Sequence, residues 1–354
     1  METAKRLTET FLKKNDEMTC LRPFIHRVLL SASILTVLGS AGVATASDNG
    51  GSGIFNLRSQ SPMQSLRMVT PFQPAGTIRP GWQLLLTATL SNVWAQESSY
   101  AMDYEMADVQ AIIGYGFSQR LELAAGYDNR AYYGGVLDGF IQGFHDLFGI
   151  DQNGRDEVPK GQSRVVRTDI ASEESDADVF NNSGLSLMLK YDAFAGSRWL
   201  PAINMSGSVR YGLDNGKAFK NNHPVDYGFS LGFGKRFSER WYTHLIFSYT
   251  IFDLTVAGDF NGFTPIRMEN QQAGGLLSFG YEYSPRWTFL GQYMVQEAAI
   301  KDISGLDEPS HEIHFGVKYS APRRGTFEFA IIQNIVSMDN SPDFGIHLGW
   351  TYPF

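Results

Sequence analysis

Apolar and polar positions alternate along most of this chain, and the alternation is clearest in its last eleven residues. Every second position there carries a large apolar side chain: Phe344, Ile346, Leu348, Trp350, Tyr352 and Phe354. The positions between them are small or polar: Gly345, His347, Gly349, Thr351 and Pro353. A period of two predicts a β-strand whose two faces meet different environments.

The same alternation predicts further strands from Trp82 onward, and a recurring short turn predicts how they are joined. The turn at 117–121 (Phe-Ser-Gln-Arg-Leu) recurs at 237–241 and 283–287, and looser copies lie at 194–199 and 319–327. Five such turns join ten strands, and the first and last alternating runs add one strand each. Twelve strands are therefore expected, with errors of roughly two to four residues, at about 82–94, 103–117, 121–131, 183–194, 202–214, 224–237, 241–252, 270–283, 287–298, 309–319, 326–337 and 344–354.

This pattern predicts an all-β fold, a closed antiparallel transmembrane β-barrel of about 12 strands with a short amphipathic helix in one extracellular loop. Lipid cannot satisfy the N–H and C=O groups of an open sheet edge, so the first strand is expected to pair with the last. The 25 Phe, 16 Tyr and 6 Trp residues suit aromatic girdles, and the 36 Gly residues suit the lumen face. No apolar run is long enough for a mature membrane helix.

The alternation that ends on Phe354, with Tyr352 two residues before it, resembles the C-terminal recognition signal of Gram-negative outer-membrane β-barrels. The resemblance implies that the six apolar residues at even positions from Phe344 to Phe354 act as an assembly signal. It also implies location in the bacterial outer membrane, with outer-membrane lipid, lipopolysaccharide and the barrel-assembly machinery as partners. Short turns are then expected in the periplasm and long loops outside.

Residues 1–46 are expected to be a cleavable signal peptide. The apolar stretch 28–38 follows Arg22 and Arg27 and precedes the sequence Ala44-Thr45-Ala46, a cleavage site of the secretory type. The leader is unusually long, so Met18 is an alternative start. Cleavage would also remove Cys20, the single cysteine, so the mature chain is expected to need no disulfide.

Two placements remain open for residues 47–80, which are rich in Gly, Ser, Gln and Pro and predict an irregular segment before the barrel of residues 81–354. The segment folds into the lumen or stays in the periplasm.

Without residues 1–46 the chain carries 23 Lys and Arg against 33 Asp and Glu, a net charge of −10. This balance disfavours a nucleic acid as partner.

Sixteen ionisable residues fall on the expected lumen face: Asp108, Glu122, Asp128, Lys190, Asp192, Arg210, Asp214, Asp226, Arg236, His244, Glu282, Glu312, His314, Lys318, Glu328 and His347. Charges of both signs on neighbouring strands have two interpretations. They pair across the interior and fill it, or they line a watered path for solutes.

The loop after the third strand contains the candidate helix. Its apolar residues follow helical spacing: Val136, Leu137, Phe140, Ile141, Phe144, Leu147 and Phe148. Its polar face lacks Lys and Arg, which argues against electrostatic binding to an anionic surface. The helix is interpreted either as a lid at the outer mouth or, with more weight, as packing on the rim.

Acidic residues follow this helix at 151–157 (Asp-Gln-Asn-Gly-Arg-Asp-Glu), but the positions of Gly and Arg do not fit an EF-hand. An Asn-Gly turn explains them better, and no metal site is predicted. Together with the run at 55–62 (Phe-Asn-Leu-Arg-Ser-Gln-Ser-Pro), the segment 145–159 resembles an uncharacterised family of proteobacterial outer-membrane proteins known only as a domain of unknown function. That resemblance implies no catalytic or ligand residues and no cofactor.

The function expected from these features is a narrow passive channel or uptake protein for small solutes. A plugged barrel with a structural or surface-interaction role is the alternative, and a membrane-embedded hydrolase is a remote one. Known barrel hydrolases resemble one another in placing a His and a Ser two residues apart on one strand face, and no such pair occurs here. His311 and His314 should face opposite sides of a strand, and His244 and Ser248 are too far apart to bond directly. No catalytic residue is therefore predicted.

Overall fold

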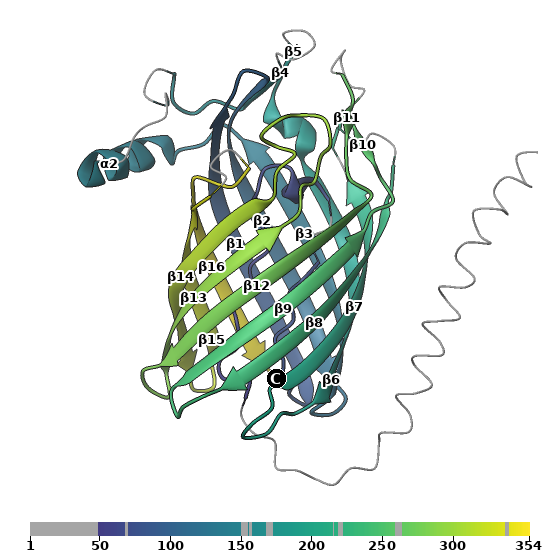
Figure 1. Ribbon diagram of the computed structural model, residues 1–354, viewed down its shortest axis with the longest axis vertical. Coiled ribbons are helices and arrows are strands. Elements are labelled where there is room, and N and C mark those ends of the chain that lie inside the picture. The colour runs from purple at the N-terminus through teal and green to yellow at the C-terminus, as the bar shows by residue number, and fades with distance from the viewer. Residues whose placement is uncertain are drawn as a thin grey trace, which may run out of the picture. The chain divides into compact units, whose positions relative to one another are not determined.

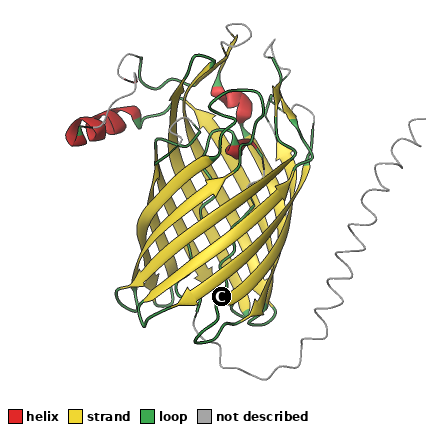
Figure 2. Cartoon of the chain, viewed as in Figure 1, coloured by secondary structure: helices red, strands yellow, loops and turns green. Residues whose placement is uncertain are grey.

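The chain forms a closed antiparallel β-barrel of twelve strands (Figures 1 and 2). The computed structural model describes residues 49–354 except 68–69, 150–154, 156–157, 168–172, 215, 219–221, 259–263 and 337–339. The predicted signal peptide of residues 1–46 lies outside the described residues. Between the first and last strands the register is continuous, from Gln83 opposite Pro353 to Asn92 opposite Phe344, so the sheet has no open edge there.

The barrel strands are β1 (Gly81–Gln96), β2 (Tyr100–Gly116), β3 (Leu121–Tyr133), β6 (Asn182–Phe194), β7 (Ala202–Asp214), β8 (Val225–Arg236), β9 (Trp241–Ile251), β12 (Gln271–Glu282), β13 (Trp287–Gln296), β14 (Ser310–Ala321), β15 (Gly325–Asn334) and β16 (Phe344–Pro353). Each pairs with its neighbours in chain order. The predicted number and order of barrel strands are confirmed. Period-two alternation was sufficient for this result because every barrel strand has one face toward the interior and one toward the outside.

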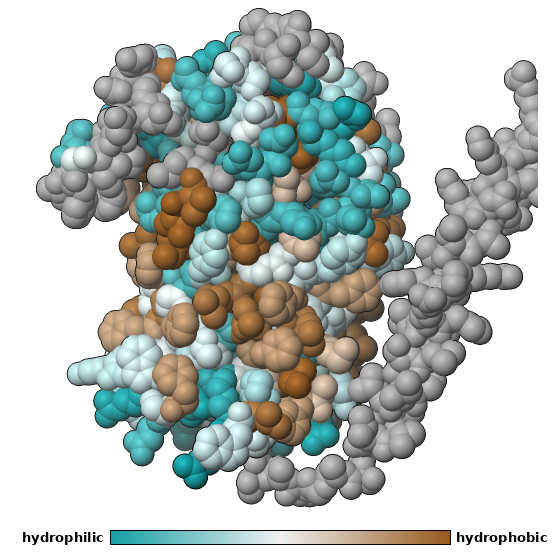
Figure 3. Space-filling view, in the orientation of Figure 1, coloured by the Kyte–Doolittle hydropathy of each residue, from teal (hydrophilic) through white to brown (hydrophobic). Residues whose placement is uncertain are grey.

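Alternation puts mostly polar and small residues inside and large apolar residues outside, although Leu276, Leu290 and Ile332 also face inward. On β9, His244 and Ile246 are fully buried, whereas Leu245, Phe247 and Tyr249 are exposed. Figure 3 shows an apolar band across the visible barrel wall, with hydrophilic residues gathered toward both ends. Such a band is stable where lipid, not water, surrounds it, and the fold is that of outer-membrane β-barrels.

Four of the short turns share one hydrogen-bonding pattern. The Oγ atoms of Ser118, Ser197, Ser238 and Ser284 each accept hydrogen bonds from backbone N–H groups two and three residues later. These bonds satisfy donors that the strand ladder leaves free. All the short turns lie at one end of the barrel together with Phe354, and we call it the turn end (Figure 1).

The opposite end, which we call the loop end, carries the long connections and the elements that alternation did not predict. These are β4 (Arg164–Arg167) and β5 (Glu173–Ser175), which extend the sheet beyond β2, the single turn η3 (Ala177–Phe180), and the short pair β10 (Val256–Ala257) and β11 (Ile266–Arg267). Asp176 caps η3. Its carboxylate accepts hydrogen bonds from Ser163 Oγ and the Asp178 N–H, which keep its pKa below the usual value.

The predicted amphipathic helix exists as α2 (Asp138–Phe148). Figure 1 shows it beside the loop end of the barrel rather than across the opening. Ile141 is fully buried, and the Phe140 ring lies 5.3 Å from that of Phe344, while Val136 is exposed. The side chains of Phe144, Leu147 and Phe148 lie outside the described residues. These described contacts join α2 to the rim of the barrel. None of the described helices is long and apolar enough to cross a membrane.

Candidate functional site

The barrel lumen contains a second part of the chain, the described residues 49–67 and 70–80, which we call the inner segment. It starts at the turn end, where His244 Nε2 and Gly50 O are 2.9 Å apart. It reaches the loop end at the short helical turn η1 (Gln64–Leu66) and returns to β1. Figure 1 shows it as the purple trace inside the barrel. Of the two placements that the sequence left open for this segment, the structure has the luminal one.

Wall side chains satisfy the backbone of the outgoing part, which forms no regular ladder of its own. Tyr242 donates a hydrogen bond to Gly53 O (2.9 Å), and the Phe55 N–H donates to Gln292 Oε1 (3.1 Å). Lys318 Nζ donates to Ser52 O (3.0 Å) and to Ile54 O. A buried irregular segment needs such partners for each polar group, because an unmet donor or acceptor costs about 1–3 kcal/mol.

Glu328 holds the next residue of the inner segment. Its carboxylate accepts from the Asn56 backbone N–H (3.0 Å) and from Asn56 Nδ2 (2.7 Å), and it pairs with Lys318 (3.1 Å). Gly349 on β16 makes room for it, since a Cβ at that glycine would lie 3.1 Å from Glu328 Oε2. This carboxylate is therefore fixed from the wall side and the lumen side together.

Midway along the lumen, Arg58 lies between two aspartates of the wall. It pairs with Asp108 on β2 and with Asp128 on β3, the latter at 3.3 Å. The wall supplies its own partners as well, because Arg130 lies 3.3 Å from Asp108 and Arg210 lies 2.8 Å from Asp128. All five side chains are buried, so water screens these charges little.

A third carboxylate faces the same stretch of the inner segment from β14. Glu312 accepts hydrogen bonds from Ser59 Oγ (2.5 Å) and from the backbone N–H groups of Gln60 (3.0 Å) and Ser61 (3.2 Å). Gln60 Nε2 in turn donates to Asp108 Oδ2 (3.2 Å). We call Asp108, Asp128 and Glu312 the carboxylate ring, because all three converge on residues 58–61.

An apolar cluster encloses the tip of the inner segment at the loop end. Met63 and Leu66 of the tip are buried there with aromatic and methionine side chains of the strands and loops, among them Tyr100, Met102, Tyr104, Met106, Tyr132, Phe180, Met268 and Ile300. We call this group the outer cluster. The tip is also tied by polar contacts, since Ser65 Oγ lies 2.6 Å from Tyr132 OH and Arg67 donates to the carbonyl groups of Leu254, Glu269 and Ala299.

The returning part of the inner segment lies against wall positions that carry glycine. A Cβ at Gly232 would lie 2.6 Å from Gln73 O, and one at Gly234 would lie 3.1 Å from Ala75 O, so larger residues would displace this backbone. Beside it, in the turn half of the lumen, is a cavity of about 890 Å³. Its lining includes Glu122, Lys190, Lys318 and Glu328, and Lys190 Nζ donates to Thr77 Oγ1 (2.7 Å).

The structure places the predicted lumen residues as follows. Asp108, Glu122, Asp128, Lys190, Asp192, Arg210, Asp226, His244, Glu312, His314, Lys318, Glu328 and His347 are buried on the inward face, Arg236 and Glu282 are half-buried there, and Asp214 is exposed at the strand end. Arg236 and Glu282 pair at 2.8 Å. Sequence reasoning missed Arg130, although it shares the inward face with Asp128 two residues earlier. It also missed Arg58, because nothing local shows that an irregular segment enters the lumen.

Two observations bear on catalysis and on metal binding. Thr89 Oγ1 lies 2.8 Å from His347 Nδ1, and His347 Nε2 lies 3.6 Å from Glu328 Oε2, which puts a hydroxyl, an imidazole and a carboxylate in a row. The hydroxyl is buried in the wall, and Thr89 does not line the 890 Å³ cavity. Among the described residues, no group of three or more His, Cys, Asp or Glu side chains is placed to hold a metal ion.

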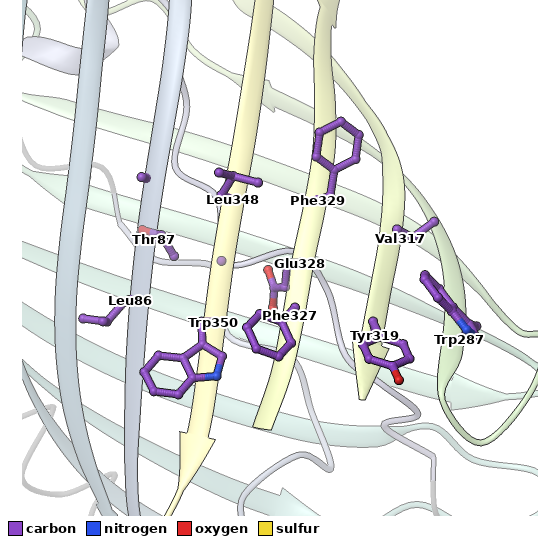
Figure 4. Close-up of a pocket in the computed structure, with 12 residues that line it drawn as sticks. Leu86, Thr87, Trp287, Val317, Tyr319, Phe327, Glu328, Phe329, Leu348 and Trp350 are labelled. Carbon is purple, nitrogen blue, oxygen red and sulfur yellow. The ribbon is translucent and has the colours of Figure 1, made fainter. Parts of the chain in front are cut away.

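The outer wall has a groove of its own near the turn end (Figure 4). Its volume is about 520 Å³, and Trp287, Tyr319, Phe327 and Trp350 contribute aromatic rings from four adjacent strands. These rings belong to the outward face of the barrel, where amphipathic aromatic side chains mark a membrane interface. The groove therefore belongs to the lipid-facing surface and is separate from the lumen.

Comparison with known proteins identifies a family and a fold. The family described as "Protein of unknown function (DUF3187)" matches residues 29–354. The structure is similar to that of an outer-membrane channel from Pseudomonas putida F1, with 11% sequence identity, 79% of this chain and 98% of that chain covered and a TM-score of 0.50. At this identity the likeness shows the fold alone.

Two further solved structures are less similar. The NanC porin has 9% identity, 77% of this chain and 99% of that chain covered and a TM-score of 0.42. The toluene transporter TbuX of Ralstonia pickettii has 9% identity, 79% and 91% coverage and a TM-score of 0.38. Among curated proteins, none matches the sequence of this chain.

Proposed function

Because the chain belongs to the DUF3187 family, whose function is unknown, we propose its function from its own lumen. The protein is a passive outer-membrane channel for small solutes, and the inner segment closes it in the present structure. It is not an enzyme. The turn end faces the periplasm and the loop end faces outward, after cleavage of a signal peptide at residues 1–46. The barrel-assembly machinery, outer-membrane lipid and lipopolysaccharide are its partners during and after insertion.

One observation carries this proposal: the wall does not fill its own interior, and a separable piece of chain does. Inward positions of β8 carry Gly228, Ser230, Gly232 and Gly234, and the inner segment lies against the last two of them. A barrel that serves only as a scaffold can fill its lumen with side chains of the wall, as small barrels do. Here the wall presents polar side chains and an apolar patch to the interior, and the inner segment, which continues into β1, fills the space between them.

The plugged structural barrel remains the second candidate, and the outer cluster favours it. The buried tip residues Met63 and Leu66 close the loop end with apolar packing that would have to open for any solute to pass. A barrel with the same fold in Pseudomonas putida F1 is an outer-membrane channel, which supports the channel function. A membrane-embedded hydrolase has the least support, because the Thr89, His347 and Glu328 row is buried in the wall.

Removal of the inner segment distinguishes the two candidates. A mature chain that begins at Pro74 keeps every barrel strand and loses the outgoing part, the tip and the first returning residues. In planar bilayers we expect large steady single-channel currents from this variant and small or brief currents from the full chain. Heat-modifiable migration on gels serves as the control for a folded barrel. A truncated chain that migrates as a folded barrel and yet conducts nothing would leave the plugged scaffold as the function.

A further inference from the structure

The inner segment and the lumen wall carry opposite charge. The inward positions of the described strands hold eight buried or half-buried carboxylates, Asp108, Glu122, Asp128, Asp192, Asp226, Glu282, Glu312 and Glu328. They hold five Arg and Lys side chains, Arg130, Lys190, Arg210, Arg236 and Lys318. The wall therefore has three negative charges in excess when its histidines are neutral. Residues 49–80 contain three arginines, Arg58, Arg67 and Arg79, and no Asp or Glu.

Arg58 comes from the inner segment and adds a third guanidinium group to a site that the wall already supplies with two. Asp108 and Asp128 each have a wall arginine of their own, so departure of Arg58 leaves neither aspartate without a partner. In its presence three guanidinium groups share two carboxylates, and Nε and Nη1 of Arg130 have no hydrogen-bond partner among the described residues. Exchange of Arg58 for another cation therefore preserves the pairs that belong to the wall itself, whereas loss without replacement leaves each aspartate with one guanidinium partner in place of two.

Glu312 is the one member of the carboxylate ring that has no Arg or Lys partner among the described residues. In the described part of the chain its one ion-pairing contact is His314 Nε2 at 3.3 Å, and its other contacts are donors of Ser59, Gln60 and Ser61. When the inner segment moves away, these three donors leave together. A carboxylate then remains on the inward face of β14 without a protein donor besides His314, which makes it attractive to a passing cation.

We propose that the carboxylate ring of Asp108, Asp128 and Glu312 selects small organic cations with N–H donors, and that Arg58 occupies this ring as an internal substitute for them. The inference rests on the proposed channel function and names its class of solute. Amines and guanidinium compounds fit, because a guanidinium group already lies between two of the three carboxylates. Rings of acidic side chains are a general means by which channels prefer cations.

A rescue experiment tests the ring without any need for conduction. Arg58→Ala in the full chain removes the internal guanidinium and should lower the thermal unfolding temperature. Free methylguanidinium should then restore part of the loss, because a ligand that binds the native state stabilises it. Tetramethylammonium at equal ionic strength is the control, since it has the same charge and no N–H donor. Should Arg58→Ala fail to fold, Arg58→Gln takes its place.

The expected result is a rise in unfolding temperature that is specific to methylguanidinium and larger in the variant than in the native chain. Equal effects of both cations, or an equal effect on the native chain, would show that the ring holds no cation site, and the proposal would be overturned.

Ion selectivity provides the second test, on the full chain in a planar bilayer with a KCl gradient. In open events, the sign of the reversal potential should show that potassium passes more readily than chloride. Glu312→Gln should shift this reversal potential toward zero. Glu239→Gln is the matched control, because it removes the same charge from an exposed turn outside the lumen. Chloride selectivity, or equal effects of the two substitutions, contradicts the proposal. Silence of every variant in the bilayer would instead count against the channel function, and the rescue experiment would still decide whether the ring binds cations.

Discussion

The inner segment is packed differently in the two halves of the lumen. In the turn half, the inner segment is held by hydrogen bonds, by ion pairs and by an apolar cluster that includes Ile54, Phe55 and Leu57, and the cavity of about 890 Å³ lies beside it. In the loop half, its tip is packed into the outer cluster of methionine and aromatic side chains. Polar contacts exchange for water at a small net cost, about 0.5–1.5 kcal/mol each. Exposure of a buried apolar side chain costs roughly 1.5–3 kcal/mol in either half. In the turn half a solute already finds space beside the inner segment, whereas at the loop end the outer cluster has to open, so the loop half should set the barrier to passage.

The largest effect should come from locking the tip at the loop end. The hydroxyl groups of Thr70 and Thr250 are in hydrogen-bond contact, and β9 ends one residue later at the loop end. Cysteines at both positions are therefore placed to form a disulfide. We expect the oxidised T70C/T250C barrel to lose solute passage in liposome-swelling assays and to regain it on reduction, because the tip can no longer leave the outer cluster.

The matched lock is S52C/T288C at the turn end, where the two native hydroxyls are 2.9 Å apart. Since the barrier lies in the other half, this disulfide should leave most of the passage intact. The single cysteine of the sequence, Cys20, falls in the predicted signal peptide, so each engineered pair reacts with itself. Equal loss of passage in both locked barrels would mean that the whole inner segment moves as one body, and the distinction between the halves would be wrong.

Two buried tyrosines offer a second, smaller test of the same difference. Tyr132 contacts Ser65 in the outer cluster, and Tyr242 donates to Gly53 in the turn half. Both side chains are at most 2% exposed. Substitution of either by Ala should destabilise the barrel by about 3–5 kcal/mol, as loss of a large buried aromatic ring does. Only Tyr132→Ala should also raise permeability to small solutes.

Chemical unfolding gives the stability change for both tyrosine variants, and liposome swelling gives the permeability. Equal loss of stability in the two variants is the internal control. It shows that a difference in permeability comes from the position of the tyrosine in the lumen and not from a less stable barrel. Greater leakage from Tyr242→Ala than from Tyr132→Ala would move the barrier to the turn half.

The same contrast explains what the sequence could predict. The barrel strands follow from a local rule, in which successive residues of a strand face lipid and the lumen in turn. Strand β16 can therefore be predicted from the residues after Phe344 alone, without knowledge of the strands that pair with it. The wall residues Asp108 and Glu312 could be placed inward by the same rule. Their common partner could not, because Arg58 lies in an irregular segment whose position depends on contacts from four or more separate strands.

The outer cluster was unpredictable for a related reason. Met63, Tyr132 and Phe180 lie far apart in sequence and share no periodic pattern, and the loops that complete the cluster fold on one another. Local pattern also did not predict β4 and β5, whose three or four residues are too short for alternation to stand out. Only the helix α2 could be recognised at this end, since eleven residues are enough to show helical spacing.

The smallest expected effect concerns α2. It distinguishes the apolar contact of Phe140 with Phe344 from the outer cluster, since both lie at the loop end. Phe140 is 55% exposed, and its ring contacts Phe344 on the outward face of β16, outside the lumen. Phe140→Ser should therefore cost about 1 kcal/mol or less, because the ring buries only part of its surface. Passage of small solutes should stay at the native level, in contrast to Tyr132→Ala, since α2 lies beside the opening and the outer cluster lies within it. If instead liposome swelling increases in Phe140→Ser while chemical unfolding shows an equally stable barrel, α2 takes part in closing the mouth, and the lid interpretation replaces packing on the rim.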